Sequence, residues 1–124
     1  MAEEYKKLFA QALNGSLSEE KNNRLANALF LGFKALTEIA KYVLAKKYGV
    51  RFEGKSSHQE IKLFYITRSR QATANLLEGA YATYVLAYEQ NQTKDKLGDI
   101  KNAIKEFSKL EDIEEEIKDL IEKI

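Results

Sequence analysis

The only histidine of the chain, His58, follows Arg51 by seven residues, and this pair is the first candidate for chemistry. Ser57-His58-Gln59-Glu60 has the pattern of a capping box, so His58 falls in the first turn of a predicted helix. Backbone N–H groups at a helix start favour anions, which indicates a phosphate or RNA site, or a ribonuclease with a displaced Arg51–His58 pair. The interpretation that we favour is a polar first-turn histidine beside a solvated arginine.

A basic segment surrounds this pair. Residues 41–75 carry eight bases against two acids, a local balance of +6, although the net charge of the whole chain is only +1. Such a patch predicts nucleic-acid or nucleotide binding, and solvated helix charges explain it equally well. The candidate phosphate-binding residues are Arg51, Lys55, His58, Lys62, Arg68 and Arg70.

Three tyrosines share one helical face further along the chain: Tyr81, Tyr84 and Tyr88. Their hydroxyls would suit a ligand groove. Tyrosine at helical spacing is more often core or subunit interface, with its hydroxyl at the wet edge, and we favour that interpretation.

The sequence has few residues suited to nucleophilic catalysis, metal binding or nucleotide binding. The chain has no cysteine and a single histidine, which argues against nucleophilic catalysis and against the usual zinc sites. The glycines match neither a P-loop nor a dinucleotide fingerprint. We therefore expect no catalytic residues, no metal and no cofactor. Neither a signal region nor an apolar stretch long enough to span a bilayer is found, so we expect a cytoplasmic protein with no membrane contact.

The elements that must position these residues are helices. Proline is absent and the apolar residues recur at helical spacing, which predicts an all-α protein. We expect a single domain over residues 1–124, an up-and-down bundle of four to five helices with its core at about 17–110. The predicted helices cover residues 2–13, ended by Asn14-Gly15; 17–48, capped by Ser16 and ended by Gly49; 57 to about 67; 72–90; and 97–110. We expect a weak break near Thr67–Gln71 and a turn at Asn91-Gln92-Thr93. The second of these helices carries one wide apolar stripe, made of Leu25, Leu29, Phe33, Leu36, Ile39, Ala40, Val43 and Leu44.

Residues 111–124 are predicted to form a C-terminal amphipathic helix. Its apolar side chains, from Ile113 to Ile124, must be buried somewhere. They pack either on their own bundle or on another subunit, and the sequence leaves both alternatives open.

Short motifs between Asn23 and Glu89 resemble the HEPN superfamily, especially its archaeal PaREP-type members. They are Ala28-Leu-Phe-Leu-Gly-Phe-Lys-Ala-Leu36, Lys46-Lys-Tyr-Gly49, Lys55-Ser-Ser-His58, and Ala80 with Tyr88-Glu89. The resemblance implies a dimeric four- or five-helix bundle, in some relatives beside a nucleotidyltransferase. The ribonuclease motif of the family, Arg-x4–6-His on a late helix, is missing, because no His follows His58 and no Arg follows Arg70. Tyr84 and Leu86 also stand where the PaREP-type pattern has His and Asn.

The expected function is a non-enzymatic, HEPN-like interaction module that forms a homodimer or binds another protein. The alternative is a nucleotide- or RNA-binding protein that uses residues 41–75, and the least favoured is the ribonuclease.

Overall fold

The computed structural model describes residues 2–52, 57–90 and 93–124, and within these ranges the chain is helical without strands. The all-α prediction is confirmed. The helices are α1 (Ala2–Lys21), α2 (Leu25–Tyr48), α3 (His58–Thr67), α4 (Gln71–Gln90), α5 (Thr93–Leu110) and α6 (Glu115–Ile121).

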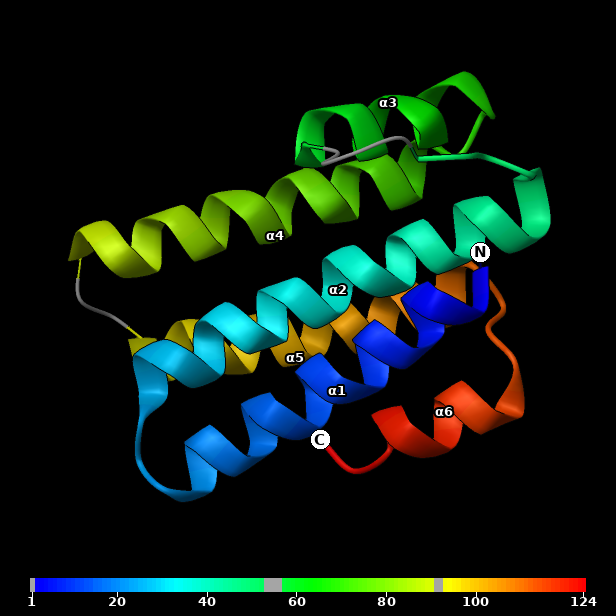
Figure 1. Cartoon of the computed structure of the whole chain (residues 1–124). Helices are drawn as coiled ribbons and strands as arrows, with labels where there is room; N and C mark the ends of the chain where they lie inside the picture. The colour runs from blue at the N-terminus through cyan, green and yellow to red at the C-terminus, as the bar shows by residue number, and fades with distance from the viewer. Residues whose placement is uncertain (1, 53–56, 91–92) are drawn as a thin grey trace.

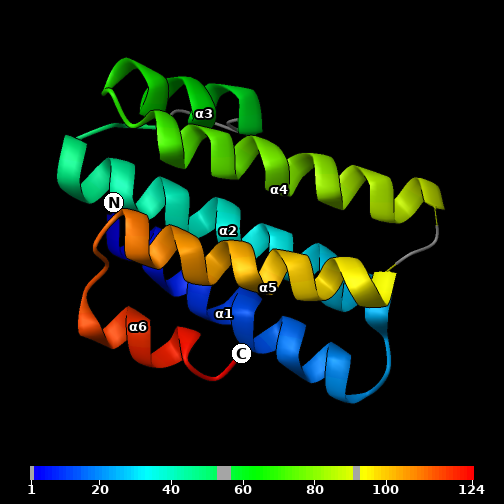
Figure 2. The same ribbon diagram turned by 180° about the vertical axis from the view of Figure 1, so that it is seen from behind.

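The four long helices α1, α2, α4 and α5 alternate in direction along the bundle (Figure 1). Helix α2 is central, because it packs against α1, α3, α4 and α5. The two short helices lie on opposite sides of the bundle: α3 lies beside the start of α4, and α6 folds back near α1 and α5 (Figures 1 and 2).

Apolar faces of the long helices form the core. On α2, Leu29, Leu36 and Ile39 are almost fully buried, which confirms most of the stripe predicted for this helix. Phe33, which belongs to the same predicted stripe, is only half-buried because it faces α4 at the edge of the core. Removal of this apolar surface from water is the main stabilising term of such a bundle.

The predicted end of the first helix at Asn14-Gly15 is wrong. Helix α1 continues through both residues to Lys21, and the turn falls at Asn22 and Asn23, where Asn23 has a φ of 60°. Glycine in a helix interior costs about 1 kcal/mol relative to alanine. Burial of Phe9, Ala12 and Leu13 against α2 outweighs this cost, so the core begins well before residue 17.

Ser16 has a different role from the predicted cap. It is buried inside α1, and its hydroxyl donates to the carbonyl oxygen of Ala28 on α2 at 2.6 Å. A Cβ at Gly15 would lie 3.1 Å from Leu31 Cδ1, so α1 and α2 approach each other closely at this level. The predicted capping box therefore does not form, because close packing of two helices uses the small residues instead.

Two predicted helix starts are also wrong, because α2 begins at Leu25 rather than at residue 17 and α5 at Thr93 rather than at Leu97, but several other boundaries are confirmed. Gly49 ends α2 in the left-handed conformation with a φ of 66°, and its N–H donates to Leu44 O. The hydroxyl of Ser57 accepts from the backbone N–H of Glu60 at 3.2 Å and caps α3. The predicted break near Thr67–Gln71 separates α3 from α4, and α5 ends at Leu110. Of the predicted turn at 91–93, residues 91–92 lie outside the described residues, and Thr93 already belongs to α5.

The C-terminal segment packs on its own bundle. Ile113, Ile117 and Ile121 are buried among core residues, so the first of the two alternatives left open by the sequence holds. The carboxylate of Glu114 anchors the segment through Tyr42 and through Lys46, whose Nζ lies 3.2 Å away. No helix in the described part of the chain is long and apolar enough to cross a membrane.

Candidate interaction surfaces

The outward side of α3 carries two of the four large apolar side chains that are exposed in the described part of the chain. Leu63 is 55% exposed and Ile66 is 37% exposed, one helical turn apart. A groove runs along this side of the helix, and we call these residues together the α3 face. Its members are Glu60, Leu63, Phe64, Ile66, Thr67 and Arg68.

The rotation of α3 about its axis is fixed by its inner side. Ile61 and Tyr65 are buried, and the Tyr65 hydroxyl donates to the carbonyl oxygen of Ala40 on α2 at 2.8 Å. Burial raises the pKa of Tyr65 well above its ordinary value, so the hydroxyl stays protonated and keeps this bond. Because Ile61 and Tyr65 must face inward, Leu63 and Ile66 must face out.

Phe64 lies at the edge between the two sides of α3. Its ring packs edge-to-face against Phe52 at 5.7 Å, and Phe52 packs in the same way against Tyr5 on α1 at 5.6 Å. This aromatic row backs the groove. A surface that is backed by packed rings loses little side-chain freedom when a partner binds.

Arg68 closes the C-terminal end of the groove. Its guanidinium lies over the rings of Phe64, at 5.4 Å, and Tyr48, at 5.9 Å. Its Nη1 donates to Phe64 O at 3.0 Å. None of the described acidic side chains forms an ion pair with it, so the charge is available to an acid on another molecule.

The five described members of the predicted phosphate-binding set have different surroundings, and several of them are engaged within the protein. Lys62 pairs with Glu78 at 2.8 Å, and Arg68 lies on the rings described above. Arg51 is exposed in the segment after α2, and Lys55 lies outside the described residues. No hydrogen bond or ion pair joins Arg51 to His58 among the described side chains, so the predicted pair is not assembled here.

Arg70 is partly exposed and reaches inward to the buried carboxylate of Glu111. Its Nε donates to Glu111 at 3.0 Å, and its Nη2 donates to Leu110 O at 2.6 Å. Thr73 also donates to the carboxylate of Glu111, which is only 1% exposed. The cluster ties the start of α4 to the end of α5, which is a structural role that the sequence interpretation missed.

His58 packs on α4 instead of facing solvent. Its ring stacks on Tyr81 with centroids 3.3 Å apart, and its Nε2 is buried with no hydrogen-bond partner. Burial lowers the pKa of His58, and nearby Lys62 adds to this effect while Glu78 opposes it. The ring is therefore neutral at pH 7, which does not suit the binding of a phosphate by charge.

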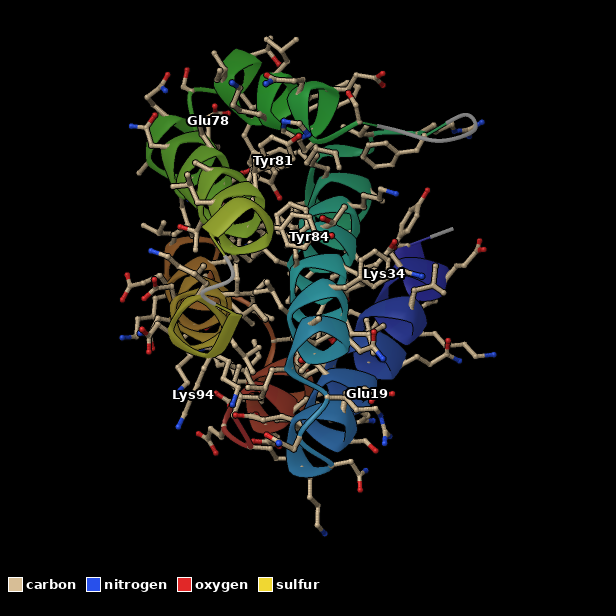
Figure 3. All side chains as sticks on the ribbon, turned by 90° about the vertical axis from the view of Figure 1, so that its left-hand side faces the viewer. Glu19, Lys34, Glu78, Tyr81, Tyr84 and Lys94 are labelled. Carbon is tan, nitrogen blue, oxygen red and sulfur yellow. The ribbon has the colours of Figure 1, made fainter. Side chains whose placement is uncertain are left out.

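The predicted tyrosine face packs on α2. Tyr84 stacks on Phe33 with centroids 4.5 Å apart and planes 9° from parallel, and Tyr81 lies 5.9 Å from the same ring. Figure 3 shows both side chains directed from α4 into the space between helices. The side chain of Tyr88 lies outside the described set. These contacts are those of a half-buried core edge.

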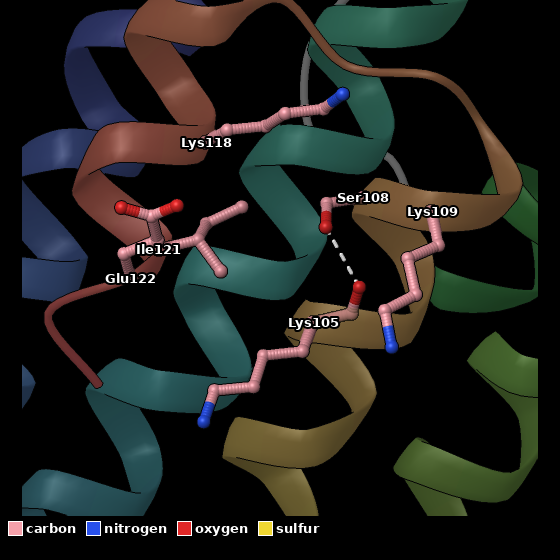
Figure 4. A pocket seen from close by; sticks show the side chains of 6 residues that line it. All are labelled: Lys105, Ser108, Lys109, Lys118, Ile121 and Glu122. Atoms are coloured by element: carbon pink, nitrogen blue, oxygen red, sulfur yellow. Dashed lines mark hydrogen bonds between the residues drawn. The ribbon is translucent and has the colours of Figure 1, made fainter.

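A second hollow lies between α5 and α6, where no site was predicted (Figure 4). Its lining residues are Lys105, Ser108, Lys109, Lys118, Ile121 and Glu122. The one buried polar side chain there, Ser108, already donates to Lys105 O at 2.7 Å, and the Lys109 and Lys118 ammonium groups lie within 4 Å of Glu106 and Asp112. Surface lysines around an apolar floor with no unsatisfied buried group do not define a ligand.

The α3 face is the surface that the sequence interpretation missed. A signal was present, because Leu63 and Ile66 lie off the inward stripe of Ile61 and Tyr65 on a short helix. Apolar residues on two sides of one peripheral helix indicate contacts on two sides. Among the described residues no cluster of acidic or histidine side chains is arranged to hold a metal ion.

No family model, no curated protein and no solved structure matches the chain. The resemblance to the HEPN superfamily therefore rests on the short sequence motifs alone, and the function must be argued from the surface of this molecule.

Proposed function

We propose that the protein is a cytoplasmic, non-enzymatic interaction module with a HEPN-like bundle, and that it binds another protein surface through the α3 face. The observation that carries the proposal is the exposure of Leu63 and Ile66, one turn apart on a helix whose inner side is already packed. Large aliphatic side chains that remain in contact with water mark interaction surfaces when they lie together.

The composition of the α3 face fits such a role. Leu63 and Phe64 line the groove together with Glu60, Thr67 and Arg68. Protein interfaces combine apolar and polar side chains in this way, and both aromatic residues and arginine are enriched in them. The partner is a second copy in a homodimer or a different protein.

The alternative of RNA or nucleotide binding has less support. Three of its candidate side chains, His58, Lys62 and Arg70, already have ring or ion-pair partners within the protein. Phosphate binding by these groups would first require those contacts to be broken, and counterion release needs free cationic side chains. The ribonuclease alternative meets the same objection at His58.

Sedimentation equilibrium over a wide concentration range tests the proposal. We expect the wild type to self-associate, and we expect the Leu63→Ser, Ile66→Ser double variant to lose that association by at least about tenfold because it removes the apolar centre. The matched control is the Phe30→Ser, Leu86→Ser double variant, which removes two side chains exposed elsewhere, on α2 and α4. Equal association of the two double variants would overturn the assignment of the α3 face.

A further inference from the structure

We propose that the first turn of α3, residues 57–61, is a pH-sensitive latch, which holds α3 on α4 while His58 is neutral and releases it when His58 takes up a proton. The chain has no other histidine, so His58 is the one side chain whose ordinary pKa lies between about pH 5 and about pH 8. The latch lies on the inner side of α3, and its action does not depend on what binds to the α3 face.

Two aromatic side chains anchor α3 to the bundle, one in each half of the helix. In the C-terminal half, the Tyr65 hydroxyl donates to Ala40 O on α2 at 2.8 Å. At the N-terminal end, the His58 ring stacks on Tyr81 of α4 with centroids 3.3 Å apart. Burial raises the pKa of Tyr65 well above its ordinary value, so this anchor does not titrate at neutral or acid pH. The His58 anchor is therefore the one that acidification can change.

The surroundings of His58 suit a neutral ring. Its Nε2 is buried and has no hydrogen-bond partner among the described side chains. The ring borders a cavity of about 10 Å³, which has room for about one water molecule. The other residues that line this cavity between α2, α3 and α4 are Phe33, Leu36, Thr37, Ala40, Ile61 and Leu77.

Protonation would place a charged N–H on Nε2 in these apolar surroundings. The one hydroxyl at the cavity, that of Thr37, already donates to Phe33 O at 3.1 Å. A buried charge without a good acceptor is costly, and the cost disappears when the ring turns out into water. The packed position of the ring is therefore favourable only while His58 is neutral.

The charged groups around His58 come from α3 and α4. Burial has the largest effect and lowers the pKa of His58, Lys62 on α3 lowers it further, and Glu78 on α4 opposes both. The residues of α2 that line the cavity carry no charge. The N–H groups at the start of α3 also disfavour a cation, whereas the ring of Tyr81 attracts one.

The direction of the pH effect follows from the lowered pKa. Below the ordinary histidine value of 6.5, a detached ring binds a proton, while the packed ring stays neutral until the pH falls further. The packing of the first turn is therefore most stable above this value, and it weakens as the pH falls toward the pKa of the packed ring. After release, α3 remains attached through Tyr65.

Proton NMR of the imidazole ring measures the titration directly, because the signals of His58 are the only ones of their kind in the chain. We expect a midpoint below 6.5 in the wild type. Lys62→Met should raise this midpoint, since it removes a repelling charge and frees Glu78 from its ion pair, and Glu78→Gln should lower it. A wild-type midpoint at or above 6.5 would overturn the latch.

Hydrogen exchange locates the opening. The Ile61 amide donates to Ser57 O at 3.1 Å and reports on the latch, whereas the amides of Val43 on α2 and Ile104 on α5 report on the bundle. After correction for the intrinsic effect of pH on exchange, we expect the protection of Ile61 to fall by at least about threefold between about pH 7 and about pH 5. The protection of Val43 and Ile104 should stay unchanged.

The matched control is His58→Phe, which keeps a flat ring against Tyr81 but cannot titrate, so its Ile61 amide should keep its protection over the same range. If circular dichroism shows that this variant does not fold, Lys62→Met and Glu78→Gln replace it. In these two variants the loss of Ile61 protection should move to higher and to lower pH, respectively, together with the midpoint of His58.

Three results of the exchange experiment would overturn the latch. The first is protection of Ile61 that stays constant in the wild type while His58 titrates. The second is an equal loss of this protection in the wild type and in His58→Phe, or a loss that does not follow the midpoint in the two charge variants. The third is loss of protection at Val43 and Ile104 together with Ile61, which indicates acid unfolding of the whole bundle.

Discussion

Helices α3 and α6 are both short and both lie at the periphery of the bundle, but they differ in how completely they are packed. Helix α6 buries Ile117 and Ile121, and the charge of Glu114 just before it is engaged by Tyr42 and Lys46. Helix α3 buries Ile61 and Tyr65 but leaves Leu63 and Ile66 in contact with water.

This difference indicates which of the two helices has a surface left for a binding partner. Most of the apolar stripe of α6 is covered within the chain, because Ile117 and Ile121 are buried and Leu120 is partly buried against the same core. The contacts of α3 are completed on one side only, and the other side carries apolar groups and charges whose partners are missing from the described part of the molecule. Amphipathic helices at a surface therefore need to be compared by what remains uncovered, not by their apolar content.

The largest expected effect comes from placing the same charge in the two helices. Ile117→Asp should lower the free energy of unfolding by about 3–5 kcal/mol, because it leaves a cavity and buries an unpaired carboxylate. Leu63→Asp should change it by no more than about 1 kcal/mol, because this side chain is mostly exposed. Urea unfolding followed by circular dichroism measures both values, and similar losses in the two variants would refute the contrast.

The next effect compares two glutamates. Glu111→Ala should cost about 3 kcal/mol, because it leaves Arg70 and Thr73 without the buried carboxylate that they share. Glu60→Ala should stay within about 0.5 kcal/mol, since Glu60 is exposed and unpaired. The same unfolding experiment, at low protein concentration so that association does not contribute, distinguishes them.

The smallest expected effect is the pH dependence of stability that Glu114, just before α6, contributes. The pKa of the Glu114 carboxyl is lowered, chiefly because Tyr42 donates a hydrogen bond to it and further because of Lys46. A carboxyl with a depressed pKa in the folded state contributes stability above its unfolded-state pKa, and this contribution is lost as pH falls through the folded-state value. Solvent screening keeps the contribution small, because the side chain is one-third exposed.

Wild type and Glu114→Gln should therefore differ in melting temperature at pH 7 and converge as the pH falls below the ordinary range of a glutamate carboxyl. Tyr42→Phe removes the main donor and should reduce the pH dependence of the difference. A gap between wild type and Glu114→Gln that widened at acid pH would contradict this account of the carboxyl.

Local chemistry was enough to predict several boundaries. Gly49 tolerates the positive φ that ends α2, and the Ser57 hydroxyl accepts from a backbone N–H at the start of α3. The polar run after Thr67 interrupts the apolar pattern between α3 and α4. Each of these boundaries therefore depends on only a few neighbouring residues. The end of α1 was not predictable in this way. Asn14-Gly15 is a local stop signal, and only packing against α2 overrides it.

The predicted phosphate-binding residues show the same difference between local sequence signals and tertiary contacts. The sequence places Lys62, Arg68 and Arg70 close together, which predicts a common basic patch. In the folded chain Lys62 forms an ion pair with Glu78, and Arg70 forms one with Glu111. Both acids are distant in the sequence from their partners. No local pattern reports such pairs.

By itself the sequence determined the helical class, most helix ends and the buried stripe of α2, because periodicity and capping act over a few residues. Only the tertiary structure decided which charges are neutralised, that the C-terminal stripe packs on its own bundle, and that the outward side of α3 stays uncovered. The physical reason is that burial and charge pairing depend on which distant residue arrives at each surface, and α2 brings those residues together by packing against four other helices.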